Sequence, residues 1–209
     1  MTAALEHETD ALLQRAVRGD ESAVADLLTR HRSRLRQMVA VRLDPRLASR
    51  IDASDVVQDV LLQASQALER YVRDRPLPFY PWLRQLARQR LHDLHVQHVL
   101  AQKRSTAREV SAGTALSDDS VMKLVREVAA SDTSPSRQLF REELRCQVQE
   151  ALSRMSDSDR EVLIMRYLER LSAQEIAAII GVSASAVSMR HLRALRRLRG
   201  LLRDALGDT

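Results

Sequence analysis

The chain has 209 residues with a formal net charge of +5, and 44% of its residues are hydrophobic and 29% charged. This length supports one domain or two small ones, and few glycines and prolines beside abundant Ala, Leu, Arg and Gln favour an all-α fold. The single cysteine, Cys146, excludes an internal disulfide framework and is expected to be a small core residue in a reducing cytoplasm. No apolar run is long enough to span a membrane, so membrane insertion is not expected.

The basic residues are almost all arginine. A positive balance favours a polyanionic partner, and the planar guanidinium group suits bidentate contacts to phosphate or guanine. A GC-rich genome would produce the same arginine bias, so composition alone leaves both explanations open.

Apolar residues recur at helical spacing through most of the N-terminal half. They predict two helices within residues 9–43, separated at Gly19. Two further helices are predicted over about residues 54–70 and 82–103, and the second of these is rich in basic side chains.

The segment between these last two helices holds Tyr71, Phe79, Tyr80 and Trp82, although the chain is only 3% aromatic. Three prolines stiffen it, because the proline ring fixes φ. Phe79 and Trp82 are expected to anchor the segment in the core. Tyr71 and Tyr80, which have polar tips, are expected to reach a binding partner. Unpaired bases suit such rings, since base–aromatic stacking contributes roughly 1–3 kcal/mol per base.

Residues 105–136 are rich in Ser, Ala and Asp and show weak periodicity. This composition predicts a flexible linker, with one short helix at about residues 121–129. A second helical block is predicted from about Gln138 to the C-terminus. The sequence therefore predicts two small helical domains joined by a flexible linker.

The C-terminal block has the spacing of a helix-turn-helix. Ser172 and Glu175 are spaced as a capping box at the start of its first helix. Gly181 stands where the turn needs a left-handed residue, and Ser183 is placed to cap the second helix. Val182, between them, is expected to pack into the core.

The second helix of this motif is expected to enter a major groove, where arginine recognises guanine and serine contacts bases or phosphate. Its basic character continues to Arg203, with no acidic residue before Asp204. A solvated amphipathic helix is the alternative interpretation. The residues predicted to contact DNA are Ser183, Ser185, Ser188, Met189, Arg190, Arg193 and Arg197.

The order of these parts resembles the sigma-70 family of bacterial RNA polymerase sigma factors, specifically the two-domain extracytoplasmic-function (ECF) group. Two stretches carry the resemblance. The sequence DVVQDV at residues 55–60 is similar to the family's core-binding helix, and residues 152–197 are similar to its domain for the promoter −35 element. The resemblance implies a region 2-like domain at residues 9–103, a flexible linker at 104–137 and a region 4-like helix-turn-helix domain at 138–205.

The resemblance implies a sigma factor that binds core RNA polymerase and directs promoter-specific transcription initiation, with no enzymatic chemistry, cofactor or metal. The implied partners are the clamp of the largest polymerase subunit, the flap of the second subunit, and promoter DNA. An anti-sigma factor is a further implied partner, because many members of the family are bound and inhibited by one. The residues implied to dock on the polymerase are Asp55, Gln58, Asp59 and Gln63. The residues implied to melt and recognise the −10 element are Tyr71, Arg73, Arg75, Tyr80, Arg84, Arg88 and His92.

Four positions depart from the family's usual pattern. Gln89 stands in the basic helix where Asn is frequent. In the recognition helix, Ala186 and Ser188 stand where Thr and Lys are common, and His191 stands where an apolar residue is usual. Because the missing lysine would be a DNA contact, the −35 sequence of relatives cannot be carried over.

Two other functions stay open on the sequence: a stand-alone helix-turn-helix regulator, and a protein-interaction module without a DNA role. The acidic helix, aromatic segment and basic helix, in this order, favour a sigma factor over a regulator. The basic helix-turn-helix argues against the interaction module.

The remaining clusters predict neither a metal site nor an active site. His92, His95 and His98 recur every three residues, but they span nearly two helical turns and no Cys or carboxylate set completes them. His92 and His95 are expected to extend the DNA-facing side of the basic helix. The sequence contains no phosphate-binding glycine loop and no nucleophile triad.

Overall fold

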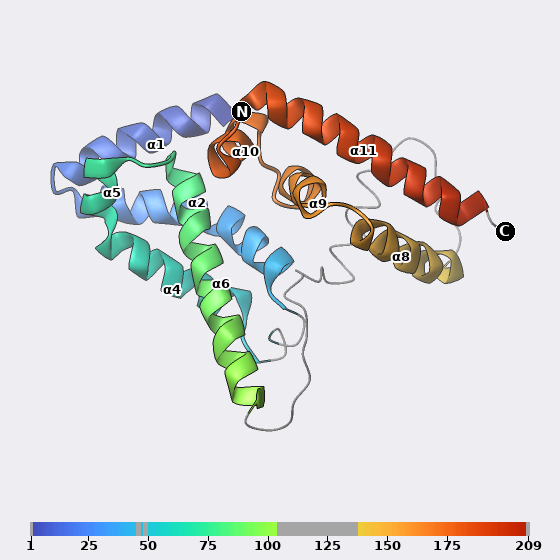
Figure 1. Ribbon diagram of the computed structural model, residues 1–209. Coiled ribbons are helices and arrows are strands. Elements are labelled where there is room, and N and C mark those ends of the chain that lie inside the picture. The colour runs from blue at the N-terminus through green and yellow to red at the C-terminus, as the bar shows by residue number, and fades with distance from the viewer. Residues whose placement is uncertain (1, 45–46, 48–49, 104–137, 208–209) are drawn as a thin grey trace. The chain divides into compact units, whose positions relative to one another are not determined.

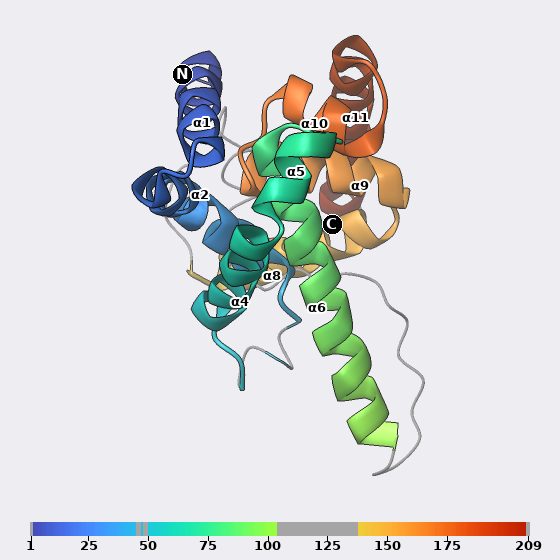
Figure 2. The same ribbon diagram turned by 90° about the vertical axis from the view of Figure 1, so that its left-hand side faces the viewer.

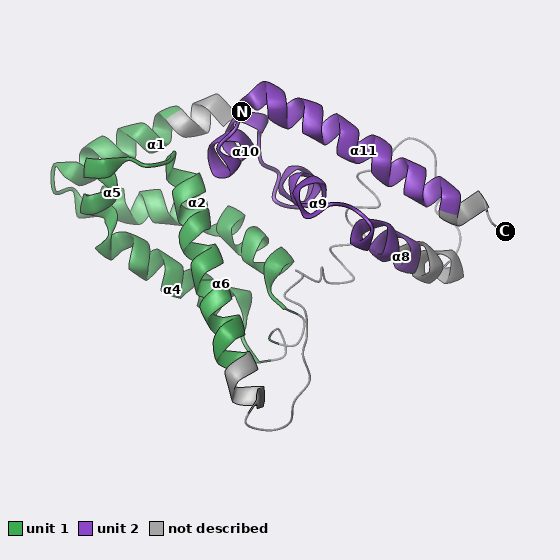
Figure 3. Ribbon diagram, in the orientation of Figure 1, with its two compact units in different colours: residues 1–115 green, residues 116–209 purple. Residues whose placement is uncertain are grey.

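Residues 2–44, 47, 50–103 and 138–207 are described by the computed structural model, and every element within these ranges is helical (Figure 1). The chain divides into two compact units, unit 1 at residues 1–115 and unit 2 at residues 116–209 (Figure 3). The predicted all-α fold with two helical domains is therefore confirmed. The short helix predicted at residues 121–129 lies outside the described residues.

Unit 1 consists of α1 (Thr2–Val17), α2 (Glu21–Arg42), α4 (Ala53–Gln66), α5 (Leu68–Asp74) and α6 (Phe79–Lys103). Helix α2 packs against α1, α4 and α6, and α4 also packs against α6. The last turns of α6 extend beyond the other helices of the unit (Figures 1 and 2). The apolar core of the unit includes Leu27, Leu35, Met38, Val39, Val56, Val57, Val60, Ala64, Leu83 and Ala87.

The predicted break between the first two helices lies at Gly19 and Asp20. Gly19 has φ +85°, a left-handed conformation that glycine adopts without steric cost. Asp20 is the N-cap of α2, and its side chain accepts a hydrogen bond from the Ala23 amide at 3.2 Å. Hydrogen bonds from Ser22 and Arg15 lower the pKa of the Asp20 carboxyl to about 2, so the cap stays charged.

The single helix predicted at residues 54–70 is two helices, because the backbone at Ala67 departs from helical geometry between α4 and α5. Helix α5 ends at Arg75, which has φ +34°. Helix α6 then begins at Phe79, three residues before the predicted start, with Pro81 in its first turn. Proline is tolerated there because the first amides of a helix have no intrahelical acceptor. The irregular part of the aromatic segment is therefore short, and most of its aromatic residues lie on helices.

Unit 2 consists of α8 (Gln138–Ser153), α9 (Asp157–Leu163), the π-helical segment η1 (Ile164–Leu168), α10 (Ala173–Ile180) and α11 (Ala184–Gly207). Helix α11 packs against α8, α9 and α10. Buried apolar residues of the unit include Val148, Leu152, Val162, Leu163, Met165, Leu168, Leu171, Ile176, Val187, Ala194 and Leu198. Two predictions for this unit are wrong, since Cys146 and Val182 are exposed rather than in the core.

Candidate nucleic-acid interface

Helices α10 and α11 form the predicted helix-turn-helix. The Ser172 hydroxyl accepts from the Glu175 amide at 3.2 Å, and the Glu175 carboxylate accepts from the Ser172 amide at 2.9 Å, which completes the capping box. Gly181 ends α10 with φ +70°. The Ser183 hydroxyl then accepts from the Ala186 amide at 3.1 Å and caps α11. The predicted capping box, left-handed glycine and serine cap are therefore confirmed.

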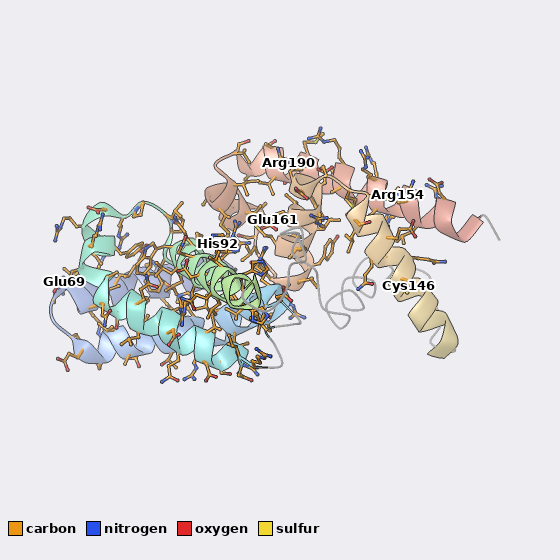
Figure 4. The ribbon with its side chains drawn as sticks, turned by 60° about the horizontal axis from the view of Figure 1, so that its bottom comes forward. Glu69, His92, Cys146, Arg154, Glu161 and Arg190 are labelled. Carbon is orange, nitrogen blue, oxygen red and sulfur yellow. The ribbon has the colours of Figure 1, made fainter. Side chains whose placement is uncertain are left out.

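The outward side of α11 carries the side chains predicted to contact the −35 duplex. The exposed members of this set are Ser183, Ser185, Ser188, Met189, Arg193 and Arg197. Arg190, which Figure 4 labels, is half-buried. The inward stripe at Val187, Ala194 and Leu198 is buried, so packing of that stripe determines which side of α11 faces outward. The arrangement presents serine, methionine and arginine side chains on one accessible helix surface.

Leu192 and His191 on α11 have roles that the sequence did not indicate. Leu192 is 46% exposed and lies one turn from Met189. His191 packs on Tyr167 of η1, with ring centroids 5.5 Å apart and 3.1 Å between the imidazole Nε2 and the phenol oxygen. Burial, followed by the nearby charge of Arg166, lowers the pKa of His191. His191 thus takes the apolar position of the family as a largely neutral packing residue.

In unit 1, the aromatic side chains pack together instead of dividing between core and surface. The Tyr71 ring stacks on Trp82 at 4.4 Å between centroids, and Phe79 packs edge-on against Tyr71 at 5.4 Å. The Tyr71 hydroxyl donates to the Leu77 carbonyl at 3.0 Å. Burial raises the pKa of the Tyr71 phenol to about 12.

Tyr80 is buried in a second group of side chains. Its ring stacks on His31 at 5.9 Å, and the Arg34 guanidinium lies 3.9 Å above the ring centroid. The Tyr80 hydroxyl lies 3.4 Å from the Arg34 carbonyl oxygen. The expectation that Tyr71 and Tyr80 reach outward is therefore wrong, because each phenol has a backbone carbonyl as its partner and needs no contact with water.

Arg84 is also buried, with 1% of its surface exposed. It shares the inward stripe of α6 with Tyr80 and Ala87, which lie four and three residues away along the helix, and its neighbour Leu83 is buried as well. The expectation that Arg84 contacts DNA phosphate is inconsistent with this position. The sequence could not reveal it, because arginine in an arginine-rich helix is normally at the surface.

The other basic side chains predicted for the −10 element are exposed. Exposed side chains on α5 and at its end are Arg73 and Arg75, and those on α6 are Arg88 and His92. His92 is labelled in Figure 4. Arg75 forms an ion pair with Asp10 of α1 at 3.3 Å. His95, in contrast, faces Asp44, with 3.6 Å between the imidazole Nδ1 and the carboxylate. The accessible basic surface of unit 1 is thus smaller than predicted.

The exposed face of α4 carries Asp55, Gln58, Asp59 and Gln63, all predicted to dock on polymerase. The Asp59 carboxylate accepts from Arg90 of α6, at 2.7 Å from Nη2 and 3.2 Å from Nε. Leu62, which the sequence reasoning did not single out, is 60% exposed on the same helix. A single exposed leucine is ordinary on a protein surface, so Leu62 by itself does not mark a binding site.

Among the described residues, no three His, Cys, Asp or Glu side chains gather in a way that could hold a metal ion. Within the same residues, no helix has the length and apolar character that crossing a bilayer requires.

Comparison with known proteins gives two family matches on this chain. Residues 27–101 match sigma-70 region 2, and residues 151–200 match sigma-70 region 4. The chain is similar to the ECF RNA polymerase sigma factor SigD of Mycobacterium tuberculosis, with 30% identity over 190 residues, covering 91% of this chain and 82% of SigD. It is also similar to the RNA polymerase sigma factor NccH of Alcaligenes xylosoxydans xylosoxydans, with 30% identity over 200 residues, covering 94% and 95% of the two chains.

Among solved structures, the chain resembles CnrH in its complex with the cytosolic domain of CnrY, with a TM-score of 0.53 and 24% identity. The match covers 94% of this chain and 98% of CnrH and supports the fold. The region 2 match covers most of α2 and runs into α6 of unit 1, and the region 4 match runs from the end of α8 into α11 of unit 2 and includes the helix-turn-helix. The chain belongs to the ECF group of the sigma-70 family and is a sigma factor that directs promoter-specific transcription initiation.

Proposed function

We propose that this sigma factor uses three separate surfaces to contact the polymerase clamp, the −35 duplex and the −10 element. The exposed face of α4 binds the clamp of the largest polymerase subunit, through Asp55, Gln58, Asp59 and Gln63. The outward side of α11 binds the −35 duplex. The exposed basic side chains of α5 and α6 bind the −10 element, and unit 2 also meets the flap of the second polymerase subunit.

The observation that carries this proposal is the exposure of both polar surfaces on well-packed helices. Side chains on α4 and α11 face outward because their opposite stripes fill the cores of unit 1 and unit 2. Rigid helices hold such side chains more accurately than loops do. The surface of α11 is basic and carries no acidic residue before Asp204, which suits the DNA backbone, whose attraction for arginine weakens with added salt.

The −10 surface in this proposal is Arg73, Arg75, Arg88 and His92. Tyr71, Tyr80 and Arg84 are left out, because they are buried in unit 1. They position the helices that carry the exposed basic residues. The protein's contribution to initiation is binding and positioning in the cytoplasm, with no covalent step, and an anti-sigma factor is a further proposed partner.

Run-off transcription with core polymerase and a genomic promoter library tests the proposal. The full chain is expected to co-elute with core enzyme and to produce specific transcripts. Asp55→Ala should weaken core binding by about tenfold, the effect of losing a well-placed interface side chain, without changing the affinity of the chain for duplex DNA. Asp55 is a cleaner choice than Asp59, since Asp59 also binds Arg90 within unit 1.

Glu69→Ala is the matched control, because it removes an exposed carboxylate from α5 instead of α4 (Figure 4). It should leave core binding unchanged. A chain that never co-elutes with core enzyme, or equal losses for Asp55→Ala and Glu69→Ala, would contradict the assignment of the α4 face.

A further inference from the structure

The outward side of α11 combines polar side chains with an apolar pair. Ser185, Ser188, Met189 and Leu192 follow one another at helical spacing and therefore share one face. Met189 is 58% exposed and Leu192 is 46% exposed. Of the six large hydrophobic side chains that are exposed in the described residues, these two and Val182 lie within the helix-turn-helix.

The serine beside Met189 makes this face less polar than its composition suggests. The Ser188 hydroxyl donates to the Ala184 carbonyl at 3.0 Å, so its proton is used within the helix. Ser188 therefore presents a CH₂ group and an acceptor oxygen beside Met189. The centre of the face is an apolar patch formed by Met189 and Leu192.

The charges around this patch indicate which class of partner it binds. Arg193, Arg196 and Arg197 are exposed on the same helix, and no acidic residue occurs from Ala184 to Arg203. The phosphate backbone that borders a major groove is a suitable partner for these arginines. In the major groove, the base feature that an apolar side chain contacts is the 5-methyl group of thymine.

We infer that Met189 and Leu192 contact a thymine 5-methyl group in the −35 duplex, so that this element contains at least one thymine recognised by its methyl group. This inference rests on the proposed function of α11. It assigns base specificity to apolar contacts at the centre of the helix face, while the arginines bind neighbouring phosphates of the duplex. Leu192 becomes a specificity-determining residue beside Met189.

The test uses the full chain with core polymerase and a library of duplexes whose base pairs are randomised across the −35 element. In the selected duplexes, each thymine is replaced singly by deoxyuridine, which lacks only the 5-methyl group. At one or two positions, deoxyuridine should weaken binding by about fourfold, the size expected for burying one methyl group. All other thymine positions should be unaffected.

Protein variants then connect the methyl group to the side chains. Met189→Gln or Leu192→Gln should bind thymine and deoxyuridine duplexes equally at an affected position, whereas Met189→Leu should keep the discrimination. Val17→Gln is the matched control, because it changes an exposed apolar residue on unit 1 and should keep the fourfold effect. Thermal unfolding of these variants should match that of the parent chain, since the altered side chains are exposed.

Three outcomes overturn the inference. The first is a selected −35 duplex in which no thymine is sensitive to deoxyuridine; promoter selection then stands while the methyl contact fails. The second is a sensitivity that persists in both glutamine variants. The third is a loss of the deoxyuridine sensitivity in the control Val17→Gln as well, which would show that the sensitivity does not depend on the α11 patch. Failure to select any duplex would overturn the proposed function as well.

Discussion

Hydrogen bonds from the phenol groups of Tyr71 and Tyr80 allow the aromatic segment of unit 1 to be buried. Tyr71 donates to the Leu77 carbonyl, and the Tyr80 hydroxyl lies 3.4 Å from the Arg34 carbonyl oxygen. A buried hydroxyl costs little once it has a partner, so both rings can enter the core with Phe79 and Trp82. The segment therefore positions α5 and α6, and contact with promoter DNA falls to their exposed basic side chains.

The raised pKa of Tyr71 predicts a loss of stability at alkaline pH. Above pH 10 the phenol ionises in the unfolded chain, whereas in the folded chain it keeps its proton until about pH 12. The unfolded state thus loses a proton first, and the free energy of unfolding falls as pH rises between these values. The expected loss attributable to Tyr71 is roughly 2 to 3 kcal/mol across this window. Urea unfolding at several pH values measures it.

Tyr71→Phe removes the ionisable group and should remove this part of the pH dependence. The same change at Tyr167 of unit 2 serves as the control. A Tyr71→Phe chain whose unfolding free energy falls with pH as steeply as that of the parent would show that Tyr71 is not the group responsible.

At the scale of elements, α4 and α6 are joined by an ion pair as well as by packing. Arg90 of α6 binds Asp59 of α4, so one carboxylate of the proposed polymerase-binding face is held by the helix proposed to contact the −10 element. The bond fixes the Asp59 side chain on the α4 surface. It also means that substitution of Asp59 affects two helices at once.

A double-mutant cycle with Asp59→Ala and Arg90→Ala should give a coupling energy below about 1 kcal/mol, because both side chains are partly exposed to water and salt screens them. Urea unfolding of the single and double variants measures this coupling. The pair Arg70 and Asp74, within one helix at 3.6 Å, is the matched comparison and should give about 0.3–0.5 kcal/mol. A coupling of several kcal/mol for Asp59 and Arg90 would contradict the description of this pair as a surface ion pair.

For the whole molecule, the main feature is that each unit has its own buried core. The proposed polymerase and −10 surfaces lie on unit 1, and the proposed −35 surface lies on unit 2. Two promoter elements can then be held by one chain, and the covalent connection raises the effective concentration of the second contact once the first has formed. Promoter selectivity is expected to need both units on one chain.

Fragments 1–103 and 138–209 test this organisation. Each should show its own cooperative thermal transition by circular dichroism, because the helices of each unit pack against one another. A mixture of the fragments should give far less specific run-off transcript than the intact chain at the same concentration. A fragment without a cooperative transition, or full activity of the mixture, would contradict the expected independence or the need for the connection.

The sequence by itself determined the features that depend on neighbours within a turn or two. The helical periodicity, the cap at Asp20, the capping box of Ser172 and Glu175, and the left-handed Gly181 are all local, since each hydrogen bond or φ angle involves residues a few positions apart. The order of an acidic helix, an aromatic segment, a basic helix and a helix-turn-helix also identified the family before any contact was known. These signals need no knowledge of packing.

Only the tertiary structure decided which side chains of those helices are accessible. Tyr71 and Tyr80 are buried because the Leu77 carbonyl, Arg34 of α2 and the facing aromatic rings supply their partners, and Arg84 is buried on the same helix as Tyr80. Leu62 and Leu192 are exposed because none of the described helices of their own unit covers them, although their residue type favours the core. Burial depends on which surfaces meet when the helices pack. Residue type and periodicity describe each helix separately, so they do not determine which of its side chains another helix covers.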